Sequence, residues 1–301
     1  MWLHCCPVGT PPRQTGPGMP ELYAERRLTD GYPGIEQLAF EQYSTGQSAK
    51  ADDTPRIERL LAALNRLASI DQSKAICVIG CGPIPQPIKI LQSMGYTSVS
   101  GIEPVPLFVR RAAEYLNATG IVSTGMAEAI PLPSESQDIV MLENVIEHVD
   151  SPVASLAEIY RVLKPAGILY LSTNNRQKVS LKVNPEFRRR FYNFFPPLLK
   201  ESYVFQHLHY TPHLANFTER PAVHWFSFAE LCCLGRNAGF AKFYAPLDLR
   251  TPADGVDASS AVKRWMMTRR WLLHAIQQTP IIRSALLSQL PIEIFMVKRP
   301  A

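Results

Sequence analysis

Two patterns of apolar and polar positions alternate over the middle of this chain. Short continuous apolar runs are typical of strands buried on both faces of a sheet. These runs cover 75–80, 97–103, 120–125, 138–143 and 168–174. Between them, apolar residues recur three and four positions apart, as on one face of a helix, in 54–67, 86–94, 107–116 and 151–163. Strands that alternate with helices predict an α/β fold, with a parallel sheet and helices on both faces.

Several helix starts carry capping signals. Thr54 and Ser151 each precede a proline, which favours a helix with the hydroxyl residue as its N-cap. Ser227 and Glu230 have the spacing of a capping box, so we expect a further helix from this point. The helix after Ser151 is expected to include Leu163 and to stop at the following KPAG sequence.

The last third of the chain closes the sheet in our interpretation. Residues 240–249 and 291–300 indicate two strands, and a basic helix rich in Trp and Met is expected over 262–276. Together with the earlier runs they predict a seven-stranded, mostly parallel sheet.

Composition divides the chain into three parts. Residues 1–20, rich in Pro and Gly, predict a disordered leader, and 21–70 an N-terminal helical segment. Residues 71–301 form the main domain, interrupted at 176–226 by a segment dense in aromatics, Arg and His. We expect this segment to be an inserted lid over the carboxyl edge of the sheet.

Charge and cysteine content narrow the function classes only slightly. The net charge of +5 over 301 residues favours an anionic partner weakly. The six cysteines lack the spacing of a zinc site, and we expect them to be reduced thiols of a cytoplasmic protein. No run approaches about 18 consecutive apolar residues, so no transmembrane helix is expected.

A glycine pair after the first strand suggests a nucleotide-like ligand. Gly80 and Gly82 let a ligand approach the backbone, and Glu103 ends the second strand 23 residues beyond Gly80. A carboxylate in that place can hold both hydroxyls of a ribose. A dinucleotide-binding loop would have a third glycine where Pro85 stands.

Four motifs with compatible spacing carry a family resemblance. They are VIGCGPIP, GIEPVPLFVRRAAEYL, GMAEAIPLPSESQDIVMLENVIEHV and LAEIYRVLKPAGILYLSTNN. Over residues 75–174 the chain resembles class I S-adenosylmethionine-dependent methyltransferases of the small-molecule type, the group that includes the ubiquinone-biosynthesis methyltransferases. The resemblance implies a Rossmann-like fold and S-adenosylmethionine as cofactor.

The resemblance also implies roles for individual residues. Gly80 and Gly82 would lie against the methionine part of the cofactor, and Glu103 would bind the ribose. The adenine would be flanked by Met126 and Ala127. Glu143 and Asn144 would line the pocket beside the transferable methyl group.

Three positions depart from the family pattern. The family often has an acid at Val78, a glycine at Ile84 and Asp at Met126. A carboxylate in place of Val78 would help to orient the cofactor's amino group. These departures keep open the alternative of a binding protein that retains the fold without catalysis.

The polar residues after the fourth strand allow two interpretations. Some relatives use E-x-x-E-H as part of a divalent metal site, and here Asn144 replaces the first carboxylate while Glu147 and His148 are retained. We predict no metal. His148 is instead the candidate base for deprotonating a hydroxyl acceptor, in competition with His207, His209, His213 and His224 of the insertion.

The acceptor is the least determined part of the prediction. We expect methylation of a small molecule, at oxygen rather than nitrogen or carbon, with the insertion forming the acceptor site. Arg188, Arg189 and Arg190 beside several aromatics also suit RNA methylation as an alternative. The segment 261–276 combines basic and aromatic residues, so peripheral membrane contact is a further possibility.

Overall fold

The computed structural model describes residues 40–41, 52–178, 190–196, 199, 203, 222, 224–251 and 270–300. The expected leader, residues 1–20, lies outside these ranges. So do most of the expected insertion and the first part of the basic helix over 262–276. The division of the chain into leader, N-terminal segment and main domain therefore stays a prediction.

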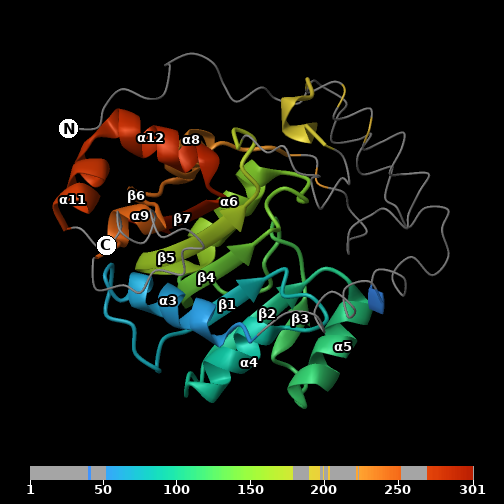
Figure 1. Ribbon diagram of the computed structural model, residues 1–301. Coiled ribbons are helices and arrows are strands. Elements are labelled where there is room, and N and C mark those ends of the chain that lie inside the picture. Colours follow the sequence, from blue (N-terminus) through green and yellow to red (C-terminus); the bar gives the residue numbers. More distant parts are fainter. Residues whose placement is uncertain are drawn as a thin grey trace.

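A seven-stranded sheet forms the centre of the molecule, as the sequence predicts (Figure 1). Its strands are β1 (Ile76–Ile79), β2 (Val99–Glu103), β3 (Val122–Thr124), β4 (Gln137–Glu143), β5 (Leu163–Thr173), β6 (Lys242–Tyr244) and β7 (Ile292–Val297). Their order across the sheet is β3-β2-β1-β4-β5-β7-β6. The first five are parallel, whereas β7 runs antiparallel to both β5 and β6.

Helices cover both faces of this sheet (Figure 1). One face packs against α3 (Thr54–Leu64), α4 (Gln86–Ser93) and α5 (Pro106–Leu116). The other packs against α6 (Pro152–Val162) and α8 (Phe228–Ala238). The remaining helical elements are the 3-10 turn η1 (Tyr192–Phe194), α9 (Pro246–Leu249), α11 (Arg270–Gln278) and α12 (Pro280–Gln289).

Alternation along β4 shows why its sequence is apolar at nearly every position. Ile139 and Met141 belong to the core under α3 and α4, while Val140 and Leu142 belong to the core under α6 and α8. All four are at most 2% exposed. A central parallel strand with both faces covered needs apolar side chains in both directions, which gives the continuous run.

Three predicted boundaries are wrong, each for a local reason. The N-cap of α3 is Asp53, and Thr54 is the first helical residue, because Asp52 accepts hydrogen bonds from the Thr54 N–H and hydroxyl. Leu163 is the first residue of β5, so KPAG lies within that strand. Of the strand expected over 240–249, only the short strand β6 forms, because Pro246 begins the short helix α9.

The helix α12 is absent from the sequence prediction. Its signal was available, because Thr279 precedes Pro280 as Ser151 precedes Pro152 at the correctly predicted start of α6. The capping box of Ser227 and Glu230 is present at α8 as predicted. Within the described ranges, no helix is long and apolar enough to cross a bilayer.

Candidate active site

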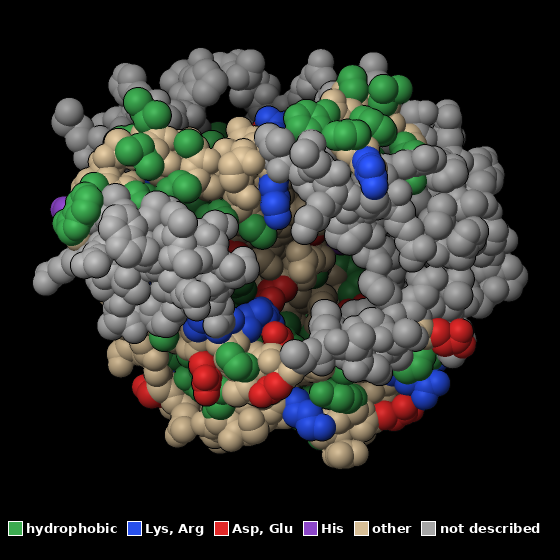
Figure 2. Space-filling model, in the orientation of Figure 1, with side chains coloured by type: hydrophobic (Ala, Val, Ile, Leu, Met, Phe, Trp, Pro, Cys, Tyr) green, Lys and Arg blue, Asp and Glu red, His purple; other side chains and the backbone are tan. Residues whose placement is uncertain are grey.

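The predicted ligand residues meet at the carboxyl edge of the parallel strands. The loop after β1 contains Gly80, β2 ends in Glu103, the turn after β3 contains Met126, and β4 ends in Glu143. Because these strands are parallel neighbours, the four positions lie at one edge. Figure 2 shows a hollow near the middle of this face, with acidic and basic side chains inside it.

Gly80 makes a turn that no other residue could make without rearrangement. Its φ of +66° is left-handed, and a Cβ there would lie 2.3 Å from Cγ2 of Val145. Its N–H donates a 2.8 Å hydrogen bond to the Ile102 carbonyl of β2. The glycine therefore lets the loop after β1 pack directly against the segment that follows β4.

The Glu103 carboxylate holds the same loop in place through a hydrogen bond. It is 5% exposed, its Oε2 accepts from the Gly82 N–H at 2.9 Å, and its Oε1 accepts from the Val105 N–H at 3.2 Å. Both oxygens of this carboxylate thus hold backbone N–H groups, one in the loop after β1 and one at the N-cap of α5.

The loop is poor in hydrogen-bond donors. Pro83, Pro85 and Pro87 have no N–H, and the N–H of Gln86 is already donated to the Ile84 carbonyl at 2.8 Å. Phosphate binding at a helix start depends on such donors. The start of α4 is thus poorly suited to a pyrophosphate, which disfavours a dinucleotide.

Met126 and Ala127 lie next to Glu103. The Gly125 N–H donates to the Glu103 carbonyl at 3.2 Å, and Met126 forms an antiparallel bridge with Ala129. Ala127 is buried, whereas Met126 is half-buried. The turn that contains Met126 and Ala127 is therefore held at the end of β2, the strand that Glu103 closes.

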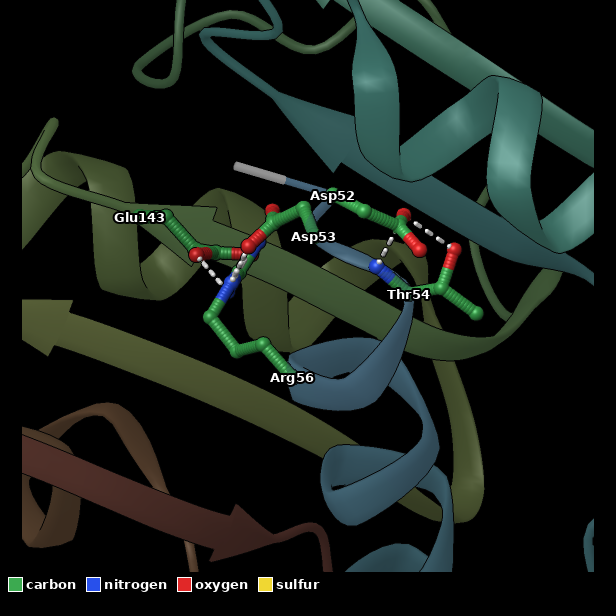
Figure 3. Close-up of polar contacts among 5 residues, drawn as sticks. All are labelled: Asp52, Asp53, Thr54, Arg56 and Glu143. Carbon is green, nitrogen blue, oxygen red and sulfur yellow. Dashed lines mark hydrogen bonds and ion pairs between the residues drawn. The ribbon is translucent and has the colours of Figure 1, made fainter. Parts of the chain in front are cut away.

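An arginine from the N-terminal helix reaches the end of β4 (Figure 3). Arg56 of α3 pairs with Oε2 of Glu143 and, at 2.7 Å, with Oδ2 of Asp53. The other Glu143 oxygen, Oε1, is buried and has no hydrogen-bond partner within the structure. Burial raises the pKa of Glu143, and the ion pair with Arg56 opposes that rise.

Two more ionisable groups surround this ion pair. Burial raises the pKa of Glu293 on β7, and the positive charges of Arg56 and Arg59 offset part of this rise. The pKa of Tyr170 on β5 lies well above its usual value, first because of burial and then because of Glu293 and Glu143. The sequence pattern does not indicate a role for these residues. Tyr170 stands in an apolar run, and nothing in the sequence shows that Arg56 of α3 meets the end of β4.

The turn after β4 holds the candidate base. Asn144 adopts a φ of 51° and is exposed, and its N–H donates to the Ser172 carbonyl at 2.9 Å. His148 is half-buried, and its N–H donates to the Val145 carbonyl at 2.8 Å. Both residues thus lie at the carboxyl edge, where the sequence places them.

A second histidine packs against this turn. Nε2 of the His224 ring lies 2.9 Å from the Val149 carbonyl oxygen, and the backbone N–H of His224 donates to the Glu147 carbonyl at 3.2 Å. Burial lowers the pKa of His224. The contacts of His224 with the Val149 and Glu147 carbonyls thus fix its ring against the turn that contains His148.

Glu147 is the most buried acid of the site. It is 2% exposed, its Oε2 has no hydrogen-bond partner within the structure, and burial raises its pKa against the attraction of His148. In the part of the chain that the structure describes, no three His, Cys, Asp or Glu side chains converge as metal ligands would.

Comparison with known proteins identifies the domain. Residues 78–171 match the family described as "Methyltransferase domain". A curated relative, an uncharacterized methyltransferase of Schizosaccharomyces pombe, is 27% identical over 130 residues. That match covers 40% of this chain and 46% of the relative, so the chain spans less than half of the relative's length.

Solved structures are similar at low identity. A possible histamine N-methyltransferase of Thermotoga maritima is 22% identical, with 68% of this chain and 81% of that chain covered and a TM-score of 0.41. A putative methyltransferase of Haloferax volcanii, solved with the activator Trm112, is 17% identical, with coverages of 88% and 97% and a TM-score of 0.49.

The chain contains a class I S-adenosylmethionine-dependent methyltransferase domain, as its motifs indicate. The finer likeness to ubiquinone-biosynthesis enzymes stays a prediction.

The residues of the edge fit S-adenosylmethionine. The cofactor carries positive charge, and Glu143 offers a buried carboxylate oxygen that lacks a partner. Glu103 is a carboxylate at the end of β2, the group that holds ribose hydroxyls in such folds, and Gly80 keeps the loop free of a side chain.

Proposed function

We propose that this protein transfers a methyl group from S-adenosylmethionine to an oxygen of a small-molecule acceptor. The observation that carries the proposal is the assembly of Gly80, Glu103 and Glu143 at one edge of a matched methyltransferase domain. Gly82, Met126, Ala127 and Asn144 would complete the cofactor site, and His148 would act in catalysis.

The chain would contribute mainly geometry and proton transfer. When bound, S-adenosylmethionine supplies an activated methyl group for in-line displacement. The edge residues would hold the acceptor oxygen in line and exclude water. His148 would accept the proton of a hydroxyl acceptor at a ring nitrogen, which requires the neutral imidazole.

The described part of the expected insertion contains an aromatic cluster. Tyr192 is buried among Phe195, Tyr203 and Trp225, so part of the aromatic segment forms a small core of its own. Phe194 is instead 56% exposed. Arg188 and Arg189 lie outside the described residues.

Calorimetry with S-adenosylmethionine tests the cofactor assignment. Glu103→Ala should weaken binding at least tenfold, which is about 1.4 kcal/mol. Glu114→Ala is the matched control, because the Glu114 side chain is 64% exposed and lies in the last turn of α5, whose first turn follows Glu103. Equal affinity of the two variants would contradict the proposed ribose contact.

Radiolabelled methyl transfer to phenol, carboxylic acid and amine panels tests the acceptor class. O-methylation predicts products on hydroxyl acceptors. Cofactor binding with no product on any acceptor would favour the non-catalytic alternative. A salt-sensitive affinity for RNA, with methylated RNA as product, would favour the RNA methyltransferase alternative.

A further inference from the structure

Glu128 joins two turns at the carboxyl edge of the sheet. Residues 126–129, here called the adenine turn, follow β3, and residues 144–151, here called the base turn, follow β4. Oε1 of Glu128 accepts hydrogen bonds from the Asp150 N–H at 2.7 Å and from the Ser151 N–H at 3.2 Å. A single carboxylate oxygen therefore bridges the adenine turn and the end of the base turn.

The same contact fixes the point at which α6 begins. Ser151 is the N-cap of α6, and its side chain accepts from the Ala154 N–H. A negative charge beside the N-terminus of a helix is favourable, and hydrogen bonds to an ionised carboxylate are stronger than those to a neutral acceptor. Glu128 therefore holds the junction between the base turn and α6 by charge as well as by hydrogen bonds.

The base turn is anchored from three directions. At its start the Asn144 N–H donates to the Ser172 carbonyl of β5 at 2.9 Å. In its middle the Glu147 carbonyl accepts from the His224 N–H at 3.2 Å. At its end stands the contact with Glu128. Of these three anchors within the described ranges, the one from Glu128 comes from the segment beside the proposed cofactor site.

The two turns also share a buried core. Ala127 and Ile130 on one side and Ile146 and Val149 on the other belong to the same apolar cluster, and each is at most 5% exposed. Close-packed side chains transmit small displacements because they leave little free volume. His148 stands in the sequence between Ile146 and Val149, so a shift of the adenine turn reaches it through packing on both sides.

We propose that Glu128 is a positioning residue that couples cofactor binding at the adenine turn to the placement of His148. A cofactor that fixes the adenine turn would fix Glu128, and through the Asp150 and Ser151 N–H groups it would fix the end of the base turn. Such coupling is reciprocal, so an acceptor that orders the base turn would also tighten cofactor binding. The inference rests on the proposed function, which supplies the adenine site and the role of His148.

Nuclear magnetic resonance of the full chain, isotope-labelled in its histidine rings, tests the coupling. The probe is S-adenosylhomocysteine, the cofactor without its methyl group, and His148→Gln assigns the His148 signals. Saturating probe should shift these signals in the wild type. In Glu128→Ala the probe should still bind, but the His148 shift at saturation should be largely lost.

Glu158→Ala is the matched control. Oε2 of Glu158 accepts from the Ile130 N–H at 3.1 Å, so it ties the segment after the adenine turn to the body of α6 rather than to the base turn. This variant should keep the full His148 shift, although it also loses a hydrogen bond to the backbone.

Glu128→Gln provides a graded comparison. Its amide oxygen can still accept both N–H groups but without the negative charge, so the His148 shift should lie between those of the wild type and Glu128→Ala. Circular dichroism checks that the variants fold. If Glu128→Ala does not fold, the reduced shift expected of Glu128→Gln carries the test.

Two results with the variants would overturn the coupling. A full His148 shift in Glu128→Ala would mean that His148 responds to the probe directly. An equal loss in Glu158→Ala would mean a general loosening of the segment. Binding of the probe to the wild type without any His148 shift would also refute the coupling, while the cofactor assignment would stand. No binding to the wild type would refute the proposed function itself, and the inference with it.

Discussion

Gly80 illustrates how a single residue positions the candidate site. Its left-handed backbone and its approach to Val145 are two separate demands, and each excludes a side chain. The sequence shows the glycine but not its neighbour, because Val145 lies 65 positions further along. The reason for the glycine is therefore visible only in the fold.

Gly80→Ala should destabilise the protein more than Gly120→Ala. Gly120 also has a positive φ, +83°, but a Cβ there would meet nothing within 4 Å. The difference between the two variants isolates the clash with Val145, which should be about 1–3 kcal/mol. Urea denaturation measures both, and equal losses would mean that Val145 moves aside freely.

Glu147 should give the protein a pH-dependent weakness. Its folded pKa is raised by burial, so the stability it contributes is complete at low pH and is lost as pH rises through that pKa. Glu147→Gln removes the ionisation. The variant should therefore gain stability relative to the wild type as pH rises from the usual glutamate range towards neutrality.

Urea denaturation across that pH range measures the effect. Glu58→Gln on the exposed side of α3 is the control for replacing a glutamate by glutamine at an exposed position. A constant offset for Glu147→Gln would mean that Glu147 ionises alike in the folded and unfolded chain.

At the scale of elements, the ion pair of Arg56 and Glu143 joins α3 to β4. Arg56→Gln would leave a largely buried carboxylate without its counter-charge. Because the Arg56 side chain is 34% exposed, solvent reduces the loss, which should be about 1–3 kcal/mol. Arg59→Gln, an exposed change one turn along the same helix, should cost less.

A double-mutant cycle separates the ion pair from general damage to α3. Arg56→Gln combined with Glu143→Gln should be more stable than the sum of the single effects predicts, because the unpaired charge is gone. Thermal unfolding measures the cycle. Additive losses would show that the two side chains do not depend on each other.

Strands and helices with a strong apolar periodicity could be predicted from the sequence. Features that depend on contacts between residues far apart in the sequence could not. β1, β2, β4, α4 and α5 lie within a few residues of their predicted ranges, because local apolar periodicity decides them. β5 begins earlier than predicted because Leu163 pairs with Gln137, a contact that a local pattern cannot show. The same limit concealed Arg56, whose role depends on a residue 87 positions away.

At the scale of the whole molecule, parallel topology explains why the residues of the candidate site lie at one edge of the sheet. Residues that end successive strands must meet at one edge, so their order in the sequence was sufficient to group Gly80, Glu103, Met126 and Glu143. Helices that approach this edge from outside, such as α3, obey no such rule. Their contributions could not be read from strand order.

The position of β7 has a consequence for how the chain is made. β7 lies between β5 and β6, although it follows both of them in the sequence. Until residues 292–297 leave the ribosome, β5 presents an open edge and β6 has no strand to join. The nascent protein is thus prone to wrong strand pairing until residues 292–297 can enter the gap between β5 and β6.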